Sequence, residues 1–370
     1  MGERARMKIT AAVTPETGAP FAVRDLELEQ PRADEVLVRI VAVGVCHTDM
    51  VVRDQQLPTP LPAVLGHEGA GIVDAVGAGV TKVSPGDHVV LSYAFCGACA
   101  NCMAGRPMYC LDFLAANFSG ARLDGTTPIQ GGVNGGFFGQ SSFASYALVN
   151  ARNVVKVDAD APLELLGPLG CGLQTGAGAV LNALRVEAGS SLVVFGVGSV
   201  GLAAVMAGQV AGCTTIIAVD LNAERLQLAL ELGATHALNP QDGDVVPRIQ
   251  ALTGGIGADY SLEATANPQV LRQAVDCLTV TGTCGLIGAA PLGTEVTLDM
   301  ASILFGRTLR GVIEGDSVPD VFIPRLVELH RQGRFPIERL IEFYDFADIN
   351  QAVEDSERGR VVKAILRTPE

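Results

Sequence analysis

Tryptophan is absent from this chain of 370 residues, and aromatic residues make up only 5% of it. Positive charge is also scarce, because 26 Lys and Arg stand against 40 Asp and Glu, for a net charge of −14. Nucleic-acid binding depends on clustered Lys and Arg side chains, so this composition argues against nucleic-acid partners. The acidic excess indicates no particular substrate.

Long hydrophobic runs are missing too, with one partial exception. The segment 192–208 approaches the length of a membrane span, but Gly196, Gly198, Ser199 and Gly201 interrupt it. A buried strand, turn and helix explain this segment better, and no hydrophobic leader follows the first residue. We therefore expect a cytoplasmic protein without a membrane segment.

Glycine, by contrast, is abundant at 43 residues, which favours tight turns between the Val-, Ile- and Ala-rich strands of an α/β fold. The length predicts two or three domains. We expect an all-β region with long loops over roughly the first 170 residues, and from about residue 173 alternating strands and helices around a parallel sheet. Strands are expected at 36–43, 69–77, 88–91, 191–195, 214–219, 259–263, 283–287, 308–313 and 361–366, and helices at 200–211, 223–232 and 319–333.

Four of the nine cysteines lie close together, as Cys96-x2-Cys99-x2-Cys102-x7-Cys110. Four thiolates can surround one tetrahedral Zn²⁺ and leave no position for a substrate, so the cluster predicts a structural zinc site. An odd cysteine count without a leader disfavours disulfides. An iron–sulfur cluster is the alternative, because its cysteine spacings overlap with those of zinc sites.

The run Gly196-Val197-Gly198-Ser199-Val200-Gly201 lies between an expected strand and an expected helix. The first glycine allows the turn, the second lets the backbone approach a pyrophosphate, and the third lets the helix pack on the strand. Asp220 ends the next strand, nineteen residues past Gly201. A carboxylate there binds the ribose hydroxyls of NAD and repels the 2′-phosphate of NADP. Arg225, one turn into the next helix, is within reach of the same ribose.

A second set of metal-ligand types consists of Cys46, His67 and Cys171. No local spacing joins them, and a single buried cysteine is more often a small hydrophobic residue than a ligand. Taken together, they are candidates for a Cys₂His zinc site with an open fourth position.

The segment Gly66-His67-Glu68-x2-Gly71-x5-Gly77-x2-Val80 resembles the zinc signature of the medium-chain alcohol dehydrogenases. The Cys46-His47-Thr48-Asp49 segment, the four-cysteine cluster, the Cys171 segment and the glycine turn appear in that family's order, over essentially the whole chain. The segments 138–144 and 168–172 resemble more narrowly the aryl-alcohol (benzyl alcohol) branch, which includes enzymes of allylic terpene alcohols such as geraniol.

The resemblance implies that Cys46, His67 and Cys171 hold a catalytic zinc, with Glu68 beside it as a transient ligand. Asp49 would accept the second ring proton of His67 and fix its tautomer. The residue that takes the proton from the alcohol would be Thr48.

The same resemblance assigns cofactor contacts and the second zinc. His47 and Lys363 would lie near the pyrophosphate of NAD, and Thr175 near its nicotinamide. The remaining cofactor contacts would be Gly196, Val197, Gly198, Ser199, Val200, Gly201, Asp220 and Arg225. The structural zinc, one of two per subunit, would be held by Cys96, Cys99, Cys102 and Cys110.

One position departs from the family pattern. Val51 stands three residues beyond Thr48, where many relatives carry a histidine that ends the proton relay. The relay then ends either in ribose hydroxyls and water or in His47. Aromatic side chains near the expected pocket suit flat aryl or allylic alcohols, and core packing is the competing interpretation for each of them. They are Tyr93, Phe95, Phe113, Phe118 and Phe143.

The implied architecture is a GroES-like β-rich catalytic domain at 1–174, with a zinc lobe at about 93–113, a Rossmann domain at 175–313 and a return segment at 314–370. The implied activity is reversible, zinc-dependent oxidation of primary aryl or allylic alcohols to aldehydes with NAD. A homodimer, or else a homotetramer, would form at the edge strand near 308–313.

Other activities fit the same motifs. One is a glutathione-dependent formaldehyde dehydrogenase, with Arg122 or Arg53 as the anchor of a glutathione carboxylate. A general aliphatic alcohol or polyol dehydrogenase is another. A quinone-reductase-like relative would lack the zinc ligands, and a zinc-bearing binding protein would lack turnover.

Overall fold

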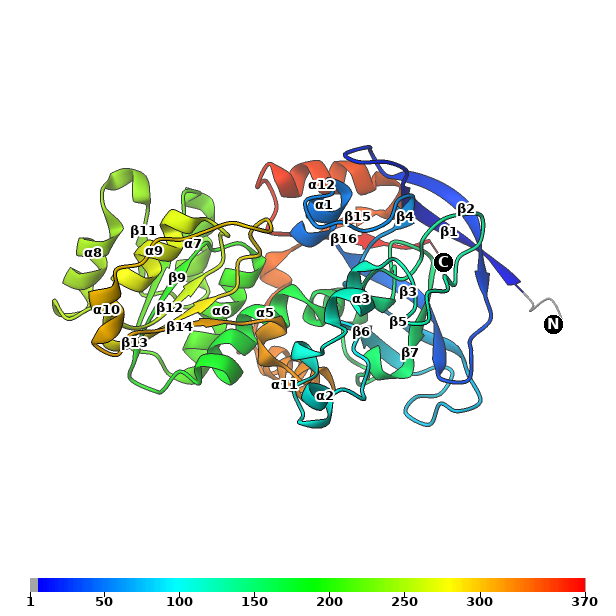
Figure 1. Ribbon diagram of the computed structural model, residues 1–370, viewed down its shortest axis with the longest axis horizontal. Helices are drawn as coiled ribbons and strands as arrows, with labels where there is room; N and C mark the ends of the chain where they lie inside the picture. The colour runs from blue at the N-terminus through cyan, green and yellow to red at the C-terminus, as the bar shows by residue number, and fades with distance from the viewer. Residues whose placement is uncertain (1–5, 370) are drawn as a thin grey trace. The chain divides into compact units, whose positions relative to one another are not determined.

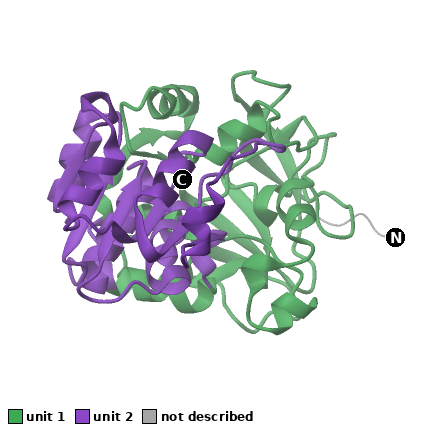
Figure 2. Cartoon of the chain, turned by 60° about the vertical axis from the view of Figure 1, so that its left-hand side comes forward, with its two compact units in different colours: residues 1–171, 318–328, 337–370 green, residues 172–317, 329–336 purple. Residues whose placement is uncertain are grey.

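The chain forms two compact units in a computed structural model that describes residues 6–369 (Figure 1). The first unit contains the chain up to Cys171, the segment 318–328 and the chain from residue 337 onward, and the second contains 172–317 and 329–336 (Figure 2). The sequence places the crossings after 174 and 313 and assigns all of 314–370 to the first unit. In the structure, residues 329–336 belong to the second unit. The amphipathic pattern over 319–333 predicts a helix but gives no sign that its end belongs to a different unit.

Two sheets form the first unit within the described residues. Its strands are β1 (Arg6–Thr14), β2 (Ala22–Glu29), β3 (Glu35–Gly44), β4 (Ala63–Val64), β5 (Gly69–Val76), β6 (His88–Leu91), β7 (Tyr146–Asn150), β8 (Val154–Lys156), β15 (Ile341–Asp345) and β16 (Lys363–Arg367). A seven-stranded sheet has the order β15-β16-β3-β5-β6-β8, with β7 also paired to β3, and a three-stranded sheet has the order β2-β1-β4. Strand β3 is buried over most of its length, which explains its almost continuous apolar sequence.

Short helices also occur in the first 171 residues, which corrects the expectation of a purely β-rich region. They are α1 (His47–Arg53), α2 (Ala100–Met103), α3 (Phe113–Phe118) and α4 (Leu163–Leu166). Each has at most seven residues, too few for a helical repeat to stand out in the sequence. Helix α12 (Ile349–Glu357) belongs to this unit as well, and both units share α11 (Pro319–Arg331).

The second unit is built on a six-stranded sheet in which every strand pair is parallel. Its strands are β9 (Ser191–Phe195), β10 (Thr215–Val219), β11 (His236–Leu238), β12 (Ala258–Glu263), β13 (Leu278–Leu286) and β14 (Thr308–Gly311), and its helices are α5 (Gly172–Gly178), α6 (Ser199–Ala211), α7 (Ala223–Glu231), α8 (Val245–Leu252), α9 (Pro268–Asp276) and α10 (Met300–Leu304). The order β11-β10-β9-β12-β13-β14 is the doubly wound order of a Rossmann sheet. Strand order reverses between β9 and β12, where such sheets bind their ligands.

Each unit has its own hydrophobic core. None of the helices in the described part of the chain is long and apolar enough to cross a membrane.

Candidate metal and dinucleotide sites

Four ligand-type side chains converge in the first unit: Cys46, His67, Glu68 and Cys171 each offer an atom within 4.8 Å of the others. The antiparallel pair β3 and β5 brings the first three together, because Val43 near the end of β3 pairs with Gly69 at the start of β5. Cys46 therefore lies just past one strand end, and His67 lies just before the other.

The imidazole of His67 has one nitrogen with a partner and one without. Its Nδ1 lies 2.9 Å from Asp49 Oδ1, and both side chains are fully buried. Its Nε2 is buried and has no hydrogen-bond partner among the described residues. A carboxylate can only accept, so Nδ1 carries a proton and Nε2 is the nitrogen that is left for a metal. Histidine binds metals through such a nitrogen, and the site therefore fits zinc.

Asp49 ties several parts of this site together. Its Oδ2 accepts the Cys46 N–H at 3.0 Å, and its Oδ1 also accepts the Gly66 N–H at 3.1 Å. The bond to the Cys46 N–H is part of the capping box that begins helix α1, for which Cys46 is the N-cap residue. Formation of α1 thus positions two candidate ligands at once.

Glu68 and Lys363 form a buried ion pair next to these ligands. Lys363 Nζ lies 2.8 and 3.0 Å from the two Glu68 carboxylate oxygens and also donates to the Val45 carbonyl at 3.1 Å. Lys363 is 2% exposed, and Glu68 is fully buried. The structure therefore brings Lys363 to the metal ligands, and its contact with the pyrophosphate stays a prediction.

Electrostatics make this pocket suited to a cation. A hydrogen bond from Cys171, aided by the positive charges of His67 and Lys363, holds the pKa of Cys46 well below its usual value despite burial. Burial works against a charged His67, but the charges of Asp49 and Cys46 outweigh it and raise the His67 pKa. A thiolate and a carboxylate thus surround the imidazole, and a divalent cation would neutralise them.

Two aromatic rings that sequence analysis missed enclose His67. Phe138 stacks on the imidazole, with ring centroids 4.4 Å apart and planes at 27°, and Phe137 meets it edge-on at 5.4 Å and 90°. The only sequence signal was the resemblance of the 138–144 segment to the aryl-alcohol branch.

The other predicted residues of the CHTD segment lie in helix α1. Thr48 is half-buried, with its Oγ1 3.9 Å from Cys46 Sγ, and His47 is exposed at the first helical position. Val51 is buried on the same helix. The structure thus places Thr48 beside a candidate ligand, and its role in proton transfer stays a prediction.

Two of the five predicted pocket aromatics lie in the core, and the other three are half-buried against it. Tyr93 and Phe143 are 1% and 0% exposed, and Phe143 packs edge-on against Phe21. Tyr93 contacts Phe95 and Phe113. Of these five aromatic residues, Phe118 lies nearest to the candidate metal site, because its ring packs against both rings that enclose His67.

The four-cysteine cluster is assembled in a separate lobe. Four of its sulfur–sulfur distances are 3.4, 3.5, 4.0 and 4.0 Å. A tetrahedral site with Zn–S bonds of about 2.3 Å requires about 3.8 Å between sulfurs, whereas a disulfide requires about 2.05 Å. An iron–sulfur cluster would hold its thiolates farther apart, around several irons and sulfides.

Backbone amides support the negative charge of that lobe. The N–H groups of Cys96, Cys99 and Leu111 donate to Cys110 Sγ, Cys96 Sγ and Cys99 Sγ at 3.3 to 3.4 Å. The backbone N–H groups of Leu111 and Cys102 lower the pKa of Cys99 to about 6, with Leu111 the larger contributor. The lobe therefore fits a structural zinc.

The predicted glycine turn lies in the second unit, between β9 and α6. Gly196 has φ +85°, and a β-carbon on Gly201 would clash with the Gly196 carbonyl. Nothing lies within 4 Å of the place where a β-carbon on Gly198 would stand, so that backbone is open to a ligand. Helix α6 begins at Ser199, so its N-terminus favours a phosphate beside this opening.

Asp220 lies at the end of β10, next to that turn. Its Oδ2 accepts the Val197 N–H at 2.8 Å, and its Oδ1 accepts the Asn222 N–H at 2.8 Å. Both bonds fix the carboxylate beside the turn while leaving lone pairs for ribose hydroxyls. Arg225 is half-buried one turn into α7, and its Nε has no hydrogen-bond partner among the described residues. Thr175 is half-buried in α5, and its nicotinamide contact stays a prediction.

Comparisons with known proteins agree with these sites. Residues 32–159 match the alcohol dehydrogenase GroES-like domain, and residues 199–329 match the zinc-binding dehydrogenase family. A geraniol dehydrogenase of Castellaniella defragrans is 48% identical over 362 residues, which cover 96% of each chain. The chain belongs to the zinc-binding, medium-chain alcohol dehydrogenases. The crystal structure of benzyl alcohol dehydrogenase from Acinetobacter calcoaceticus matches with a TM-score of 0.96 and 51% identity, over 98% of this chain and 100% of that one.

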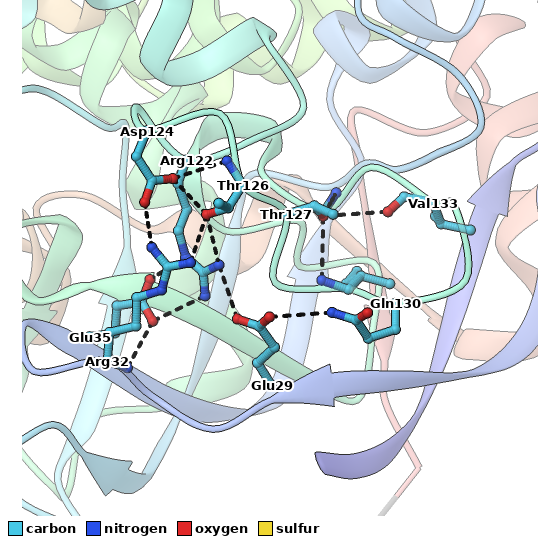
Figure 3. Close-up of polar contacts among 11 residues, drawn as sticks. Glu29, Arg32, Glu35, Arg122, Asp124, Thr126, Thr127, Gln130 and Val133 are labelled. Atoms are coloured by element: carbon cyan, nitrogen blue, oxygen red, sulfur yellow. Dashed lines mark hydrogen bonds and ion pairs between the residues drawn. The ribbon is translucent and has the colours of Figure 1, made fainter. Parts of the chain in front are cut away.

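A third relative of this dehydrogenase is the S-(hydroxymethyl)glutathione dehydrogenase of Paracoccus denitrificans, 36% identical over 97% of this chain and 100% of that protein. The two arginines considered as glutathione anchors are already paired. Arg122 lies 2.5 Å from Glu35 and 3.2 Å from Glu29, inside the polar network of Figure 3. Arg53 pairs with Asp54 and Glu357 at 2.7 and 2.8 Å.

Arg122 also lines a cavity of about 290 Å³ in the first unit. This cavity is not the metal site, because none of the four converging ligand residues lines it. The cavity is also lined by Glu35, which pairs with Arg122, and by the ion pair of Arg32 with Asp124. Much of the charge on the cavity wall is therefore neutralised by these ion pairs.

Proposed function

We propose that this dehydrogenase catalyses the reversible, zinc- and NAD-dependent oxidation of primary aryl or allylic alcohols to aldehydes. The observation that carries the proposal is the convergence of ligand atoms from Cys46, His67 and Cys171, with Nε2 of His67 buried and without a hydrogen-bond partner among the described residues. Two thiolates and one imidazole form a catalytic zinc site with an open fourth position.

The proposed roles divide the reaction among residues near that position. Oxidation removes one hydride and one proton from the alcohol; bound NAD would supply the hydride acceptor, and the Thr48 hydroxyl takes the proton while passing its own proton on. Bound zinc would act as a Lewis acid that lowers the pKa of an oxygen ligand. Asp49 keeps the proton of His67 on Nδ1, so that Nε2 stays a ligand. Because Val51 cannot carry a proton, the relay passes to His47 or to ribose hydroxyls and water.

Glu68 has a further proposed role as a transient ligand. Its carboxylate lies among the other ligand atoms, yet Lys363 binds both of its oxygens. Burial raises the pKa of Glu68, and the positive charge of Lys363 opposes this rise. The carboxylate lies close enough to the other candidate ligands to join them on a bound zinc without a large movement of the chain.

Preference for NAD over NADP rests on Asp220. Two backbone N–H groups hold this carboxylate beside the glycine turn, where it would repel a 2′-phosphate. We expect Asp220→Asn to lower the preference for NAD, measured as the ratio of kcat/KM values with the two cofactors. An unchanged ratio would argue against this role.

The substrate class is supported by the named activities of two relatives and by the aromatic rings around His67. Phe137 and Phe138 are buried against His67 and make the surroundings of the candidate ligands apolar and aromatic, which favours an aryl or allylic alcohol over a charged substrate. Glutathione adducts are the runner-up substrates, but the paired states of Arg122 and Arg53 leave neither guanidinium free for a glutathione carboxylate.

The decisive experiment combines metal analysis with a substrate panel. We expect two zinc ions per chain, and NADH formation with benzyl alcohol and geraniol that exceeds formation with ethanol or S-hydroxymethylglutathione. In Cys46→Ser the catalytic zinc and the turnover should both be lost, while Cys213→Ser, in the second unit, serves as the matched control. Full turnover by a Cys46→Ser protein that lacks the catalytic zinc would refute the proposal.

We also propose a homodimer formed at β14, the edge strand of the six-stranded sheet. Large apolar side chains before and beside this strand are exposed: Leu292 at 80%, Met300 at 87%, Leu304 at 81% and Phe305 at 69%. Such side chains are typical of a buried interface. Light scattering would distinguish a dimer from the alternative tetramer. The proposed location is the cytoplasm, where cysteine ligands stay reduced.

A further inference from the structure

The segment that carries Phe138 is bonded along the segment that carries His67. The N–H groups of Ser142 and Phe143 donate to the carbonyls of Gly66 and Leu65 at 2.9 and 3.0 Å. The Ser141 hydroxyl donates to the Val64 carbonyl at 2.7 Å.

Gln140 completes this attachment at His67 itself. Its Nε2 donates to the His67 carbonyl at 2.9 Å, and its Oε1 accepts the Gly69 N–H at 3.2 Å. Gly66 makes the close approach possible, because it has φ +85° and a β-carbon there would clash with Phe143. Main-chain positions on both sides of His67 are therefore fixed relative to the Phe138 segment.

Phe138 has a backbone conformation that a bulky residue rarely adopts. Its φ and ψ are +50° and +29°, in the left-handed region, and its side chain is 4% exposed. Such strain persists only where surrounding bonds over-determine the backbone, and it concentrates at functional sites. The bonds to 64–69 supply that constraint, and the strained conformation lays the ring flat on His67.

The hydrogen bond to Asp49 holds Nδ1, but a single hydrogen bond tolerates a range of lengths and angles. Within that range the two side-chain torsions of His67 can still vary and move Nε2 relative to Cys46 and Cys171. The face of Phe138 and the edge of Phe137, at 27° and 90° to the imidazole, remove that freedom. Phe118 packs behind Phe138 at 5.2 Å and keeps it in place.

We propose that Phe138 is a positioning residue that sets the ring plane of His67 and thereby the affinity of the catalytic site for its metal. The proposal rests on the proposed function, because it takes Cys46, His67 and Cys171 as zinc ligands. Its readout is metal retention, which requires neither substrate nor NAD.

The test measures zinc release from the intact protein to an excess of a chromogenic chelator. In Phe138→Leu, which keeps an apolar side chain but loses the flat ring, we expect one of the two zinc ions to leave about 10- to 100-fold faster than in the wild type, the range typical of groups that orient a metal ligand. The second zinc, in the four-cysteine cluster, should leave at the wild-type rate. Phe138→Tyr keeps the stacked ring and should restore slow release.

The matched control is Phe21→Leu, which removes a buried ring from the same core cluster without touching His67. Both zinc ions should leave this variant at the wild-type rate. If Phe138→Leu does not fold, Phe118→Leu should accelerate release of the same zinc by a smaller factor, because Phe118 supports Phe137 and Phe138 without contacting His67 through its own ring.

Cobalt substitution gives a second readout. The visible ligand-field bands of Co²⁺ at the catalytic site should shift in Phe138→Leu and not in Phe21→Leu. Unchanged release and unchanged bands in Phe138→Leu would overturn the proposal, as would equal acceleration of both zinc ions, which indicates general loosening. A wild-type protein that binds only one zinc would instead refute the proposed function.

Discussion

Replacement of Asp49 by asparagine is the most direct test of how the metal site is held. The carboxylate accepts three hydrogen bonds, from His67 and Gly66 on Oδ1 and from Cys46 on Oδ2. Asparagine has the same shape but only one oxygen and an NH₂ group that cannot accept. If the oxygen faces His67 and Gly66, the NH₂ group faces the Cys46 N–H.

That arrangement leaves one buried N–H unpaired, which costs about 1–3 kcal/mol of folding free energy. If the amide turns the other way, it donates to His67 Nδ1 and moves the ring proton to Nε2, where it blocks metal binding. In either orientation the negative charge that supports the imidazole is lost. We expect metal affinity to fall about 10- to 100-fold, equivalent to about 1.4–2.7 kcal/mol.

The assay is a competition titration of zinc against a chelator of known affinity, with thermal unfolding of the same samples. Asp54→Asn is the matched control, because Asp54 caps the other end of α1, is one-third exposed and pairs with Arg53. The reasoning fails if Asp49→Asn binds zinc within twofold of the wild type, or if the control loses as much affinity as the variant.

Three further predictions concern other parts of the chain. Cys99→Ser should lower the thermal midpoint by about 5–10 °C and release one zinc, with kcat falling only as the lobe unfolds; a loss of kcat in fully folded protein would contradict a purely structural role. Gly198→Ala should weaken NAD binding, measured by fluorescence titration, without changing the unfolding midpoint, whereas Gly201→Ala should lower the midpoint, because its β-carbon meets the Gly196 carbonyl. Burial raises the pKa of Cys284 to about 12, so about one thiol in 10,000 is ionised at pH 8, and mass spectrometry should find Cys284 alkylated by iodoacetamide only after unfolding.

Features whose residues are close along the chain could be predicted without a structure. The spacing of Cys96, Cys99, Cys102 and Cys110 predicted a metal lobe, because the loops between the cysteines are short enough to close around one ion. The order of strand, glycine turn, helix, strand and Asp220 predicted a dinucleotide site for the same reason. The alternation of strand and helix patterns predicted most strands of the second unit. Strand β11 was not predicted, because its three residues are too few to show a pattern.

Which side chains far apart in the sequence come into contact depends on the fold. Lys363 reaches Glu68 across 295 positions, because β16 pairs with β3 and β3 pairs with β5. The pairing of β3 with β5 likewise brings Cys46 to His67, and the spacing of these two residues in the sequence does not predict their contact. The stacking of Phe138 on His67 depends on a left-handed backbone conformation, which a bulky residue rarely adopts. Contacts of this kind arise from strand register and burial, which are properties of the folded chain, and they are what turn separate motifs into one metal site.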